Sequence, residues 1–115
     1  MKYTQLGHNG PTVSQIGIGT AGFGAVWDGE PMTDEETAHE SLSDAEERGI
    51  TYIDTANNYG LPSGASEEII GRWLADVDRS GFVLASKAGQ DQFGTERRSG
   101  YSRRNLRYQI EQSLE

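Results

Sequence analysis

An acid, a phenol and an amine lie where successive apolar stretches of this sequence end. Asp54 closes the apolar run 50–54, Tyr59 follows in the polar loop after it, and Lys87 closes a second run, 82–87. Such groups can exchange protons with a bound substrate when the fold brings them together. Enzymes with parallel sheets place their catalytic side chains at the C-terminal ends of the strands. The pattern therefore predicts an active site that contains these three side chains.

Each of the three residues has a plainer explanation when it is taken alone. An aspartate at a strand end commonly caps a turn. A tyrosine in a loop is more often packed than catalytic, and a lysine at a strand end is usually solvated, although Lys2 is the only other lysine here. The functional interpretation therefore depends on the ordered set and not on any single member.

Turn signals and periodicity predict the elements that position these residues. Asn9-Gly10-Pro11 predicts a turn between two short strands, 2–6 and 12–16. Three predicted strands then alternate with three predicted helices, the strands at 17–20, 50–54 and 82–87 and the helices at 34–48, 67–77 and 103–115. This alternation is typical of parallel βα units with right-handed crossovers.

The helices are predicted from their caps and their apolar spacing. Thr33 and Glu36 predict a capping box for the first helix and Gly49 its end, while Ser66 and Ser102 are the predicted caps of the other two. Apolar residues three and four positions apart mark the helices. They are Ala38, Leu42 and Ala45 in the first, Ile69, Ile70, Trp73, Leu74 and Val77 in the second, and Leu106, Ile110 and Leu114 in the third.

The order of elements predicts an α/β fold. Three parallel strands alone would leave unpaired sheet edges, which natural proteins avoid. We therefore expect residues 1–115 to be the N-terminal portion of a (β/α)8 TIM barrel, a hairpin plus three βα units, truncated within the third helix. A complete barrel of this kind has typically ~250 residues.

The composition excludes several classes of function. The chain has 18 acidic and 10 basic residues, a formal net charge of −8, and no cysteine. The phosphate backbone of nucleic acid needs clustered cations, so we expect no nucleic-acid partner. No apolar run approaches the ~18 residues of a membrane span and no signal peptide is present, so we expect a cytoplasmic protein without a membrane partner. The acidic, lysine-poor composition favours a halophilic, salt-rich cytoplasm, where screening relieves charge repulsion.

Several motifs in a fixed order carry a resemblance to a known family. They are Leu6-Gly, Val13-Ser and Gly17-Ile-Gly-Thr20, then Gly49 with Asp54-Thr-Ala-Asn-Asn-Tyr59-Gly60, and finally Ser66-Glu67, Ile70-Gly71 and Ser86-Lys87. In order and spacing this set resembles the aldo-keto reductases, and the resemblance spans essentially all 115 residues.

The resemblance implies an NADP(H)-dependent oxidoreductase that reduces aldehyde and ketone carbonyls, with residues 1–115 in its barrel domain. It implies a catalytic tetrad of Asp, Tyr, Lys and His, of which Asp54, Tyr59 and Lys87 match the first three. The histidine has no counterpart, because His8 falls in the hairpin turn and His39 on the expected exposed side of the first helix.

The resemblance also implies where the small molecules bind. Gly19, Thr20 and Ala21 match the cofactor-side loop after the first strand, and Asp54 can reach the ribose edge of the cofactor. The loop 21–32 is rich in glycine and aromatic residues, and Phe23 and Trp27 are the candidate walls of a pocket for a small carbonyl substrate. For Trp27, covering one end of the barrel is an equal alternative. No metal site is expected.

The three matched residues suit carbonyl reduction, which needs a hydride from the cofactor and a proton for the developing alkoxide. A free phenol has a pKa of about 10, and a nearby ammonium stabilises the phenolate. Tyr59 is therefore the predicted acid, Lys87 the cation that tunes it, and Asp54 the anchor of Lys87. Two alternatives stay open. One is an inactive fragment or a reductase-like binding subunit, and the other is a barrel enzyme that uses Asp54 with a metal, which the lack of neighbouring ligands disfavours.

Overall fold

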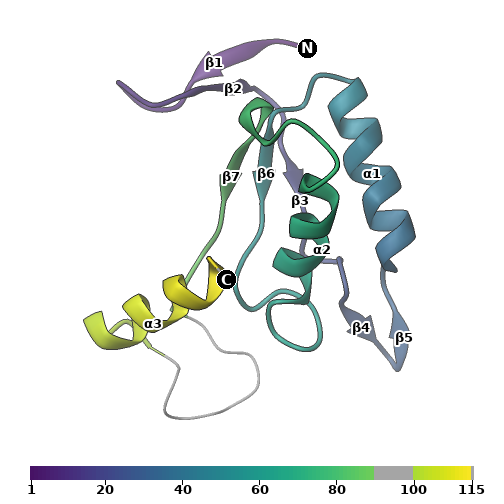
Figure 1. Cartoon of the computed structure of the whole chain (residues 1–115), viewed down its shortest axis with the longest axis vertical. Coiled ribbons are helices and arrows are strands. Elements are labelled where there is room, and N and C mark those ends of the chain that lie inside the picture. Colours follow the sequence, from purple (N-terminus) through teal and green to yellow (C-terminus); the bar gives the residue numbers. More distant parts are fainter. Residues whose placement is uncertain (90–99, 115) are drawn as a thin grey trace.

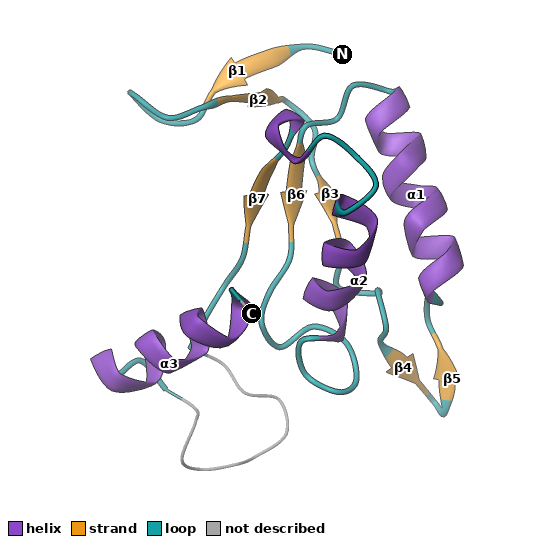
Figure 2. Cartoon of the chain, in the orientation of Figure 1, coloured by secondary structure: helices purple, strands orange, loops and turns teal. Residues whose placement is uncertain are grey.

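The computed structural model describes residues 1–89 and 100–114. Figures 1 and 2 show an open parallel sheet flanked by helices, with one small hairpin above it and another at its side. The strands are β1 Tyr3–Gln5, β2 Thr12–Ser14, β3 Ile18–Gly19, β4 Val26–Trp27, β5 Glu30–Pro31, β6 Tyr52–Asp54 and β7 Val83–Ala85. The helices are α1 Glu35–Glu47, α2 Ala65–Leu74, the short 3-10 turn η1 Arg79–Gly81 and α3 Arg103–Ser113.

The central sheet confirms the predicted parallel arrangement. Its strand order is β3-β6-β7, and both pairings are parallel, with Gly19 opposite Asp54 and Asp54 opposite Ala85. Strands that are neighbours in sequence are thus neighbours in the sheet, and each pair is joined through a helix. Within the described residues the sheet stays open, with β3 and β7 as its edges, and it closes no barrel.

The hydrophobic core lies between this sheet and helices α1 and α2. Leu42 of α1, Ile53 of β6 and Ile70 of α2 are each 1% exposed. Trp73 packs edge-on against Phe82, with 5.1 Å between the ring centroids. The predicted apolar face of α1 is therefore confirmed, and so is that of α2 as far as Trp73. Helix α2 ends at Leu74, so Val77, predicted to lie in it, packs against the core from beyond the helix. Burial of these faces holds both helices against the sheet.

The β1–β2 hairpin lies across the N-terminal ends of the central strands (Figure 1). Its register pairs Tyr3 with Ser14, as expected from the turn signal at Asn9-Gly10-Pro11. Ser14 and Thr51 bind each other reciprocally, each backbone amide donating to the other hydroxyl oxygen at 2.9 Å. The hairpin therefore closes the end of the sheet that is opposite to the candidate site.

The capping box predicted for α1 is wrong. Asp34 is the N-cap, and its carboxylate accepts a hydrogen bond from the Thr37 amide at 2.8 Å. Thr33 instead forms an isolated bridge with Phe23, which ties the loop before the helix to the loop after β3. The end of the helix is as predicted, since Gly49 has a φ of +77°, which favours glycine.

The cap predicted for α2 is also wrong. Gly64, with a φ of +98°, is the N-cap, and no side chain caps this helix. Ser66 lies inside the first turn and is fully buried. Its hydroxyl turns toward the sheet, because the buried hydroxyls of Thr20, directly after β3, and of Thr55, in the β6–α2 loop, offer it partners there.

Residues 21–32, predicted to be loop, contain the hairpin β4–β5. Val26 pairs with Pro31 and Trp27 with Glu30. The turn between them is Asp28-Gly29, with φ values of +52° and +82°. An Asp-Gly pair between short extended segments is a strong hairpin signal, and it was present in the sequence.

Helix α3 begins where the sequence predicts it, with Ser102 accepting a hydrogen bond from the Asn105 amide at 3.2 Å. Its apolar positions are less buried than the pattern suggests, since Ile110 is 52% exposed and Leu114 81%. The residue that this helix buries is Gln109. Residues 90–99, between the third predicted strand and the third predicted helix, lie outside the described residues. None of the described helices is both long and apolar enough to cross a membrane.

Candidate active site

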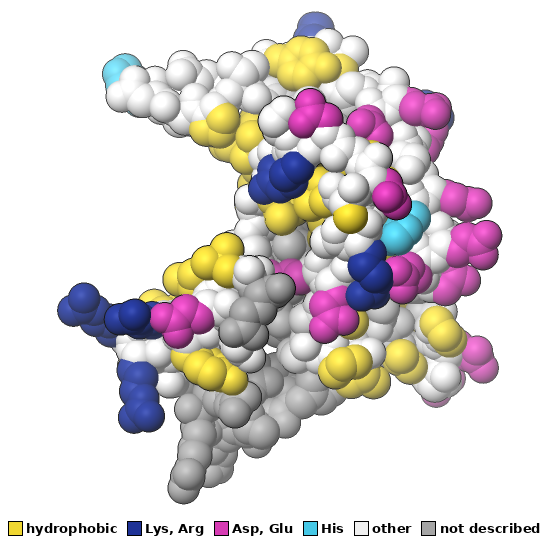
Figure 3. Space-filling view, viewed as in Figure 1, with side chains coloured by type: hydrophobic (Ala, Val, Ile, Leu, Met, Phe, Trp, Pro, Cys, Tyr) yellow, Lys and Arg dark blue, Asp and Glu magenta, His cyan; other side chains and the backbone are white. Residues whose placement is uncertain are grey.

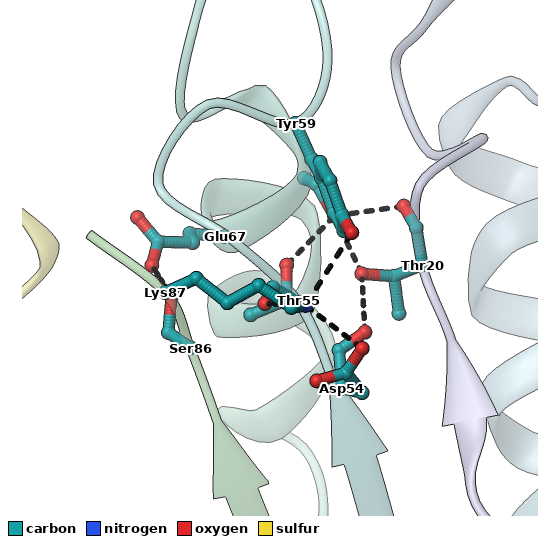
Figure 4. A network of polar contacts seen from close by, with 8 residues as sticks. Thr20, Asp54, Thr55, Tyr59, Glu67, Ser86 and Lys87 are labelled. Carbon is teal, nitrogen blue, oxygen red and sulfur yellow. Dashed lines mark hydrogen bonds and ion pairs between the residues drawn. The ribbon is translucent and has the colours of Figure 1, made fainter. Parts of the chain in front are cut away.

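The three predicted catalytic residues meet at the C-terminal edge of the sheet (Figure 4). Asp54 is the last residue of β6, Tyr59 lies in the loop between β6 and α2, and Lys87 lies two residues beyond β7. Because β6 and β7 are parallel neighbours, their C-terminal ends lie side by side. The sheet topology thus brings together side chains that are far apart in the sequence.

The ammonium of Lys87 is the centre of the site. It donates to Asp54 Oδ2 at 2.8 Å, to the Thr55 carbonyl oxygen at 2.9 Å and to the Tyr59 hydroxyl at 3.3 Å. It also lies 4.9 Å from the centroid of the Tyr59 ring. All three donor positions of the ammonium are therefore used, and one of them is used on the phenol.

These contacts keep Lys87 charged. The hydrogen bond to Asp54 raises the pKa of Lys87, partial burial opposes this effect, and the contact with Tyr59 adds to it. The side chains of Lys87 and Asp54 are 50% and 41% exposed, so solvent screens the pair and it contributes little to stability. Its chemical consequence is larger, because a fixed positive charge lies beside a phenol that can lose a proton.

The loop that carries Tyr59 is held closely over the start of α2. The Tyr59 amide donates to the Ala56 carbonyl at 3.1 Å, and its carbonyl accepts from the Ser66 amide at 3.2 Å. Gly60 has a φ of +87°, and a Cβ there would lie 2.7 Å from that of Ala65. Only glycine fits after Tyr59, and this tight turn fixes the direction of the phenol.

A buried hydroxyl cluster, formed by Thr20, Thr55 and Ser66, lies beneath the site. All three residues are 0% exposed. The Ser66 hydroxyl lies 2.9 Å from Thr20 Oγ1 and 3.1 Å from Thr55 Oγ1, and Thr20 Oγ1 donates to the Asp54 carbonyl at 3.2 Å. The cluster joins the end of β3, the end of β6 and the start of α2. Sequence reasoning missed it, although small hydroxyl residues beside two strand ends and a helix start were a usable signal.

The predicted cofactor-side residues separate into two groups. Gly19 and Ala21 are exposed at the end of β3, and a Cβ on Gly19 would meet no atom within 4 Å. Thr20 is buried, its amide donates to the Asp54 carbonyl, and its own carbonyl accepts from Phe23 and Ser66. Hydrogen bonding within the fold is the role that the structure gives Thr20, and cofactor binding by Gly19, Thr20, Ala21 and Asp54 stays a prediction.

The predicted pocket walls lie in different environments. Phe23 is 6% exposed and belongs to the hydrophobic core, whereas Trp27 is 76% exposed on the β4–β5 hairpin. Packing is the role that the structure gives Phe23, and a role for either residue in substrate binding stays a prediction. In the part of the chain that the structure describes, no three His, Cys, Asp or Glu residues are grouped as metal ligands.

Neither histidine of the chain takes part in the Lys87 contacts. His8 lies in the turn of the β1–β2 hairpin. His39 is not on an exposed side of α1 as expected. It is half-buried against α2, with Nε2 3.0 Å from the Ile69 carbonyl oxygen. Its position is explained by helix packing, because an imidazole can fill the space between two helices and satisfy a carbonyl at once.

Comparison with known proteins agrees with this geometry. A sequence model of the Aldo/keto reductase family matches residues 15–115. The chain belongs to the aldo-keto reductase family. The aldo-keto reductase YhdN of Bacillus subtilis (strain 168) is 41% identical over 93 residues, which are 79% of this chain and 27% of that protein. The L-glyceraldehyde 3-phosphate reductase of Escherichia coli (strain K12) is 34% identical over 118 residues, 99% of this chain and 32% of that protein.

Solved aldo-keto reductase structures have the same fold over this segment. PA4992 of Pseudomonas aeruginosa superposes with a TM-score of 0.78 at 35% identity, over 97% of this chain and 41% of that one. The holo form of AKR11C1 from Bacillus halodurans gives a TM-score of 0.76 at 30% identity, over 99% of this chain and 35% of that one. The chain thus spans about a third of the length of the reductases that it matches. Its family membership makes it an oxidoreductase.

Proposed function

We propose that this aldo-keto reductase reduces aldehyde and ketone carbonyls with NADP(H), and that Tyr59 donates the proton. The observation that carries this proposal is the position of the Lys87 ammonium, 2.8 Å from Asp54 and 3.3 Å from the Tyr59 hydroxyl. A structural ion pair needs no phenol beside it, whereas a phenol that gives up its proton leaves a phenolate, which a nearby cation stabilises. Three residues from two strand ends therefore form one proton-delivery unit.

In this unit each side chain has a separate task. The Tyr59 hydroxyl donates a hydrogen bond to the carbonyl oxygen of the substrate and passes its proton there as negative charge develops. The Lys87 ammonium stabilises the phenolate that remains. Asp54 balances the charge of Lys87 and, together with the Thr55 carbonyl, holds the ammonium in place. The substrate is a small-molecule carbonyl compound.

The chemistry of the surface beside Asp54 fits a dinucleotide. Gly19 lies opposite Asp54 in the sheet register, and no side chain fills the space at its Cα. The Asp54 carboxylate, 41% exposed, can accept hydrogen bonds from ribose hydroxyls. Gly19, Ala21 and Asp54 would therefore hold part of a nicotinamide cofactor, which supplies the hydride when it is bound.

The choice between the two nicotinamide cofactors is part of the proposal. The NADH-specific methylglyoxal reductase of Escherichia coli (strain K12) is 35% identical over 91 residues. Relatives of this chain therefore include one named for NADH. Rates of carbonyl reduction with NADPH and with NADH, measured side by side, test this point, and a higher kcat/KM with NADH would overturn the preference for NADP(H).

The role of Tyr59 is tested with Tyr59→Phe in the enzyme expressed from its complete coding sequence. We expect kcat/KM for NADPH-dependent carbonyl reduction to fall by about 10²–10⁴-fold, the usual value of one acid. Tyr3→Phe is the matched control, since that hydroxyl binds the Gly49 carbonyl at the far end of the sheet. Turnover of Tyr59→Phe within threefold of wild type would refute the assignment. Cofactor binding without turnover in the wild type would instead favour a reductase-like binding subunit.

A further inference from the structure

Helix α3 buries an amide where a helix usually buries an apolar side chain. Gln109 is 5% exposed. Its Oε1 accepts hydrogen bonds from the Gly89 amide at 2.6 Å and from Asn57 Nδ2 at 3.1 Å. Both partners are donors, so they determine which end of the Gln109 amide faces them. A buried polar side chain with two well-formed bonds acts as a geometric constraint as well as filling space.

Both partners of Gln109 are tied to the Lys87 backbone. Gly89 follows Lys87 by two residues, and the Asn57 amide donates to the Lys87 carbonyl at 3.2 Å. Strand β7 ends at Ala85, so beyond it the Lys87 backbone is held to the β6 side through this hydrogen bond from Asn57. Asn57, Gly89 and Gln109, called here the Gln109 clamp, hold the segment in its place.

The same helix also reaches the residue before Lys87. The Ser86 hydroxyl donates to Glu67 Oε1 at 2.5 Å, and the Ser113 hydroxyl donates to Glu67 Oε2 at 3.0 Å. Figure 4 shows Glu67 and Ser86 beside Lys87 and away from the phenol. Helix α3 is thus linked to the chain before and after Lys87. After Lys87, Gln109 binds the Gly89 amide directly, and before it, Ser113 is linked to Ser86 through Glu67.

From these contacts we infer that Gln109 is a positioning residue for Lys87. By holding Gly89 and Asn57 together, it fixes the backbone from which the Lys87 side chain extends to Asp54 and Tyr59. This inference rests on the proposed function of the site. A lysine side chain has four rotatable bonds, and a displaced backbone would let the ammonium leave the phenol while it still pairs with Asp54.

The test compares Gln109→Met, which removes the acceptor at similar volume, with Gln112→Met, the same change on the exposed face of α3. We expect Gln109→Met to lower kcat about tenfold or more, since misplacement by ~1 Å can cost about a hundredfold. The KM for NADPH stays near the wild-type value.

A purely structural role would lower the stability of Gln109→Met but leave its kcat and the resonance of its Lys87 ammonium at the wild-type values, and that result would overturn the inference. Wild-type kinetics for Gln109→Met would overturn it as well. If Gln109→Met does not fold, Asn57→Ala decides, since it removes another member of the Gln109 clamp and leaves α3 intact. A wild-type kcat in Asn57→Ala refutes positioning.

A second readout does not need the proposed activity. Hydrogen exchange of the Gly89 amide, followed by NMR, should become about tenfold faster or more in Gln109→Met and stay unchanged in Gln112→Met. The resonance of the Lys87 ammonium should move in the first variant only. If wild type and Tyr59→Phe show that the proposed function is wrong, these two measurements still decide whether Gln109 positions Lys87. An unchanged exchange rate and an unchanged resonance would refute it.

Discussion

Ser66→Ala should destabilise the protein far more than an ordinary serine substitution. The Ser66 hydroxyl is fully buried and lies within hydrogen-bond distance of Thr20 Oγ1, the Thr20 carbonyl and Thr55 Oγ1. In the described part of the chain, every buried side-chain nitrogen or oxygen has a partner. The substitution would break this condition, because Ser66 is the partner shown for Thr55 Oγ1.

The magnitude follows from the cost of a buried group without a partner. One net hydrogen bond contributes about 1 kcal/mol, and a buried hydroxyl left unsatisfied costs about 1–3 kcal/mol. Thr20 Oγ1 keeps its bond to the Asp54 carbonyl, so only Thr55 carries the full penalty. We therefore expect the free energy of unfolding to fall by about 2–3 kcal/mol.

The assay is urea denaturation followed by circular dichroism, on the protein expressed from its complete coding sequence. Ser41→Ala is the control, because the Ser41 hydroxyl donates only within its own helix, to the Thr37 carbonyl at 2.8 Å. Its effect should stay within about 0.5 kcal/mol. Adding Thr55→Val to Ser66→Ala should recover part of the loss, since both partners are then apolar.

Two results would refute this reasoning. The free energy of unfolding of Ser66→Ala could lie within about 0.5 kcal/mol of the wild-type value, which would mean that the hydroxyl contributes nothing to stability. Alternatively, the effects of Ser66→Ala and Thr55→Val could simply add. Additivity is expected of groups that do not interact, and it would show that the two hydroxyls are not coupled.

Two further predictions concern charge. The pKa of Lys87 in the folded protein is raised above its ordinary value of 10.5. The stability that the charged lysine adds is therefore present at neutral pH, and it is lost as the pH rises through the pKa of the folded state. The difference in unfolding free energy between wild type and Lys87→Met should therefore shrink above pH 10.5, and a difference that grew with pH would contradict the pairing. Acidic side chains gather over α1 in Figure 3. The chain has 18 acidic residues against 10 basic ones, which gives a formal net charge of −8. The Tm should therefore rise in molar KCl, measured against molar sorbitol as an uncharged control, and a Tm that stays constant would count against a salt-rich habitat.

Local pattern was enough to place most elements and the three-residue site. Apolar spacing predicted the buried faces of α1 and α2, and the turn residues predicted the first hairpin and the end of α1. The alternation of strands and helices implied parallel pairing, and parallel pairing places the ends of neighbouring strands together. Asp54 and Lys87 could therefore be joined from sequence alone, because each lies at the end of a predicted strand, although β7 itself ends at Ala85, two residues before Lys87.

Tertiary structure decided the contacts that the local pattern leaves open. Ser66 looks like a helix cap, but its hydroxyl faces Thr20, 46 residues away in the chain. Gln109 looks like a solvated helix residue, but it binds Asn57 across 52 residues. Periodicity records which side chains are apolar, whereas a polar side chain turns inward only when a distant segment offers it a partner. That choice is made when the elements pack, so the support of the site, unlike its three principal residues, became visible only in the folded chain.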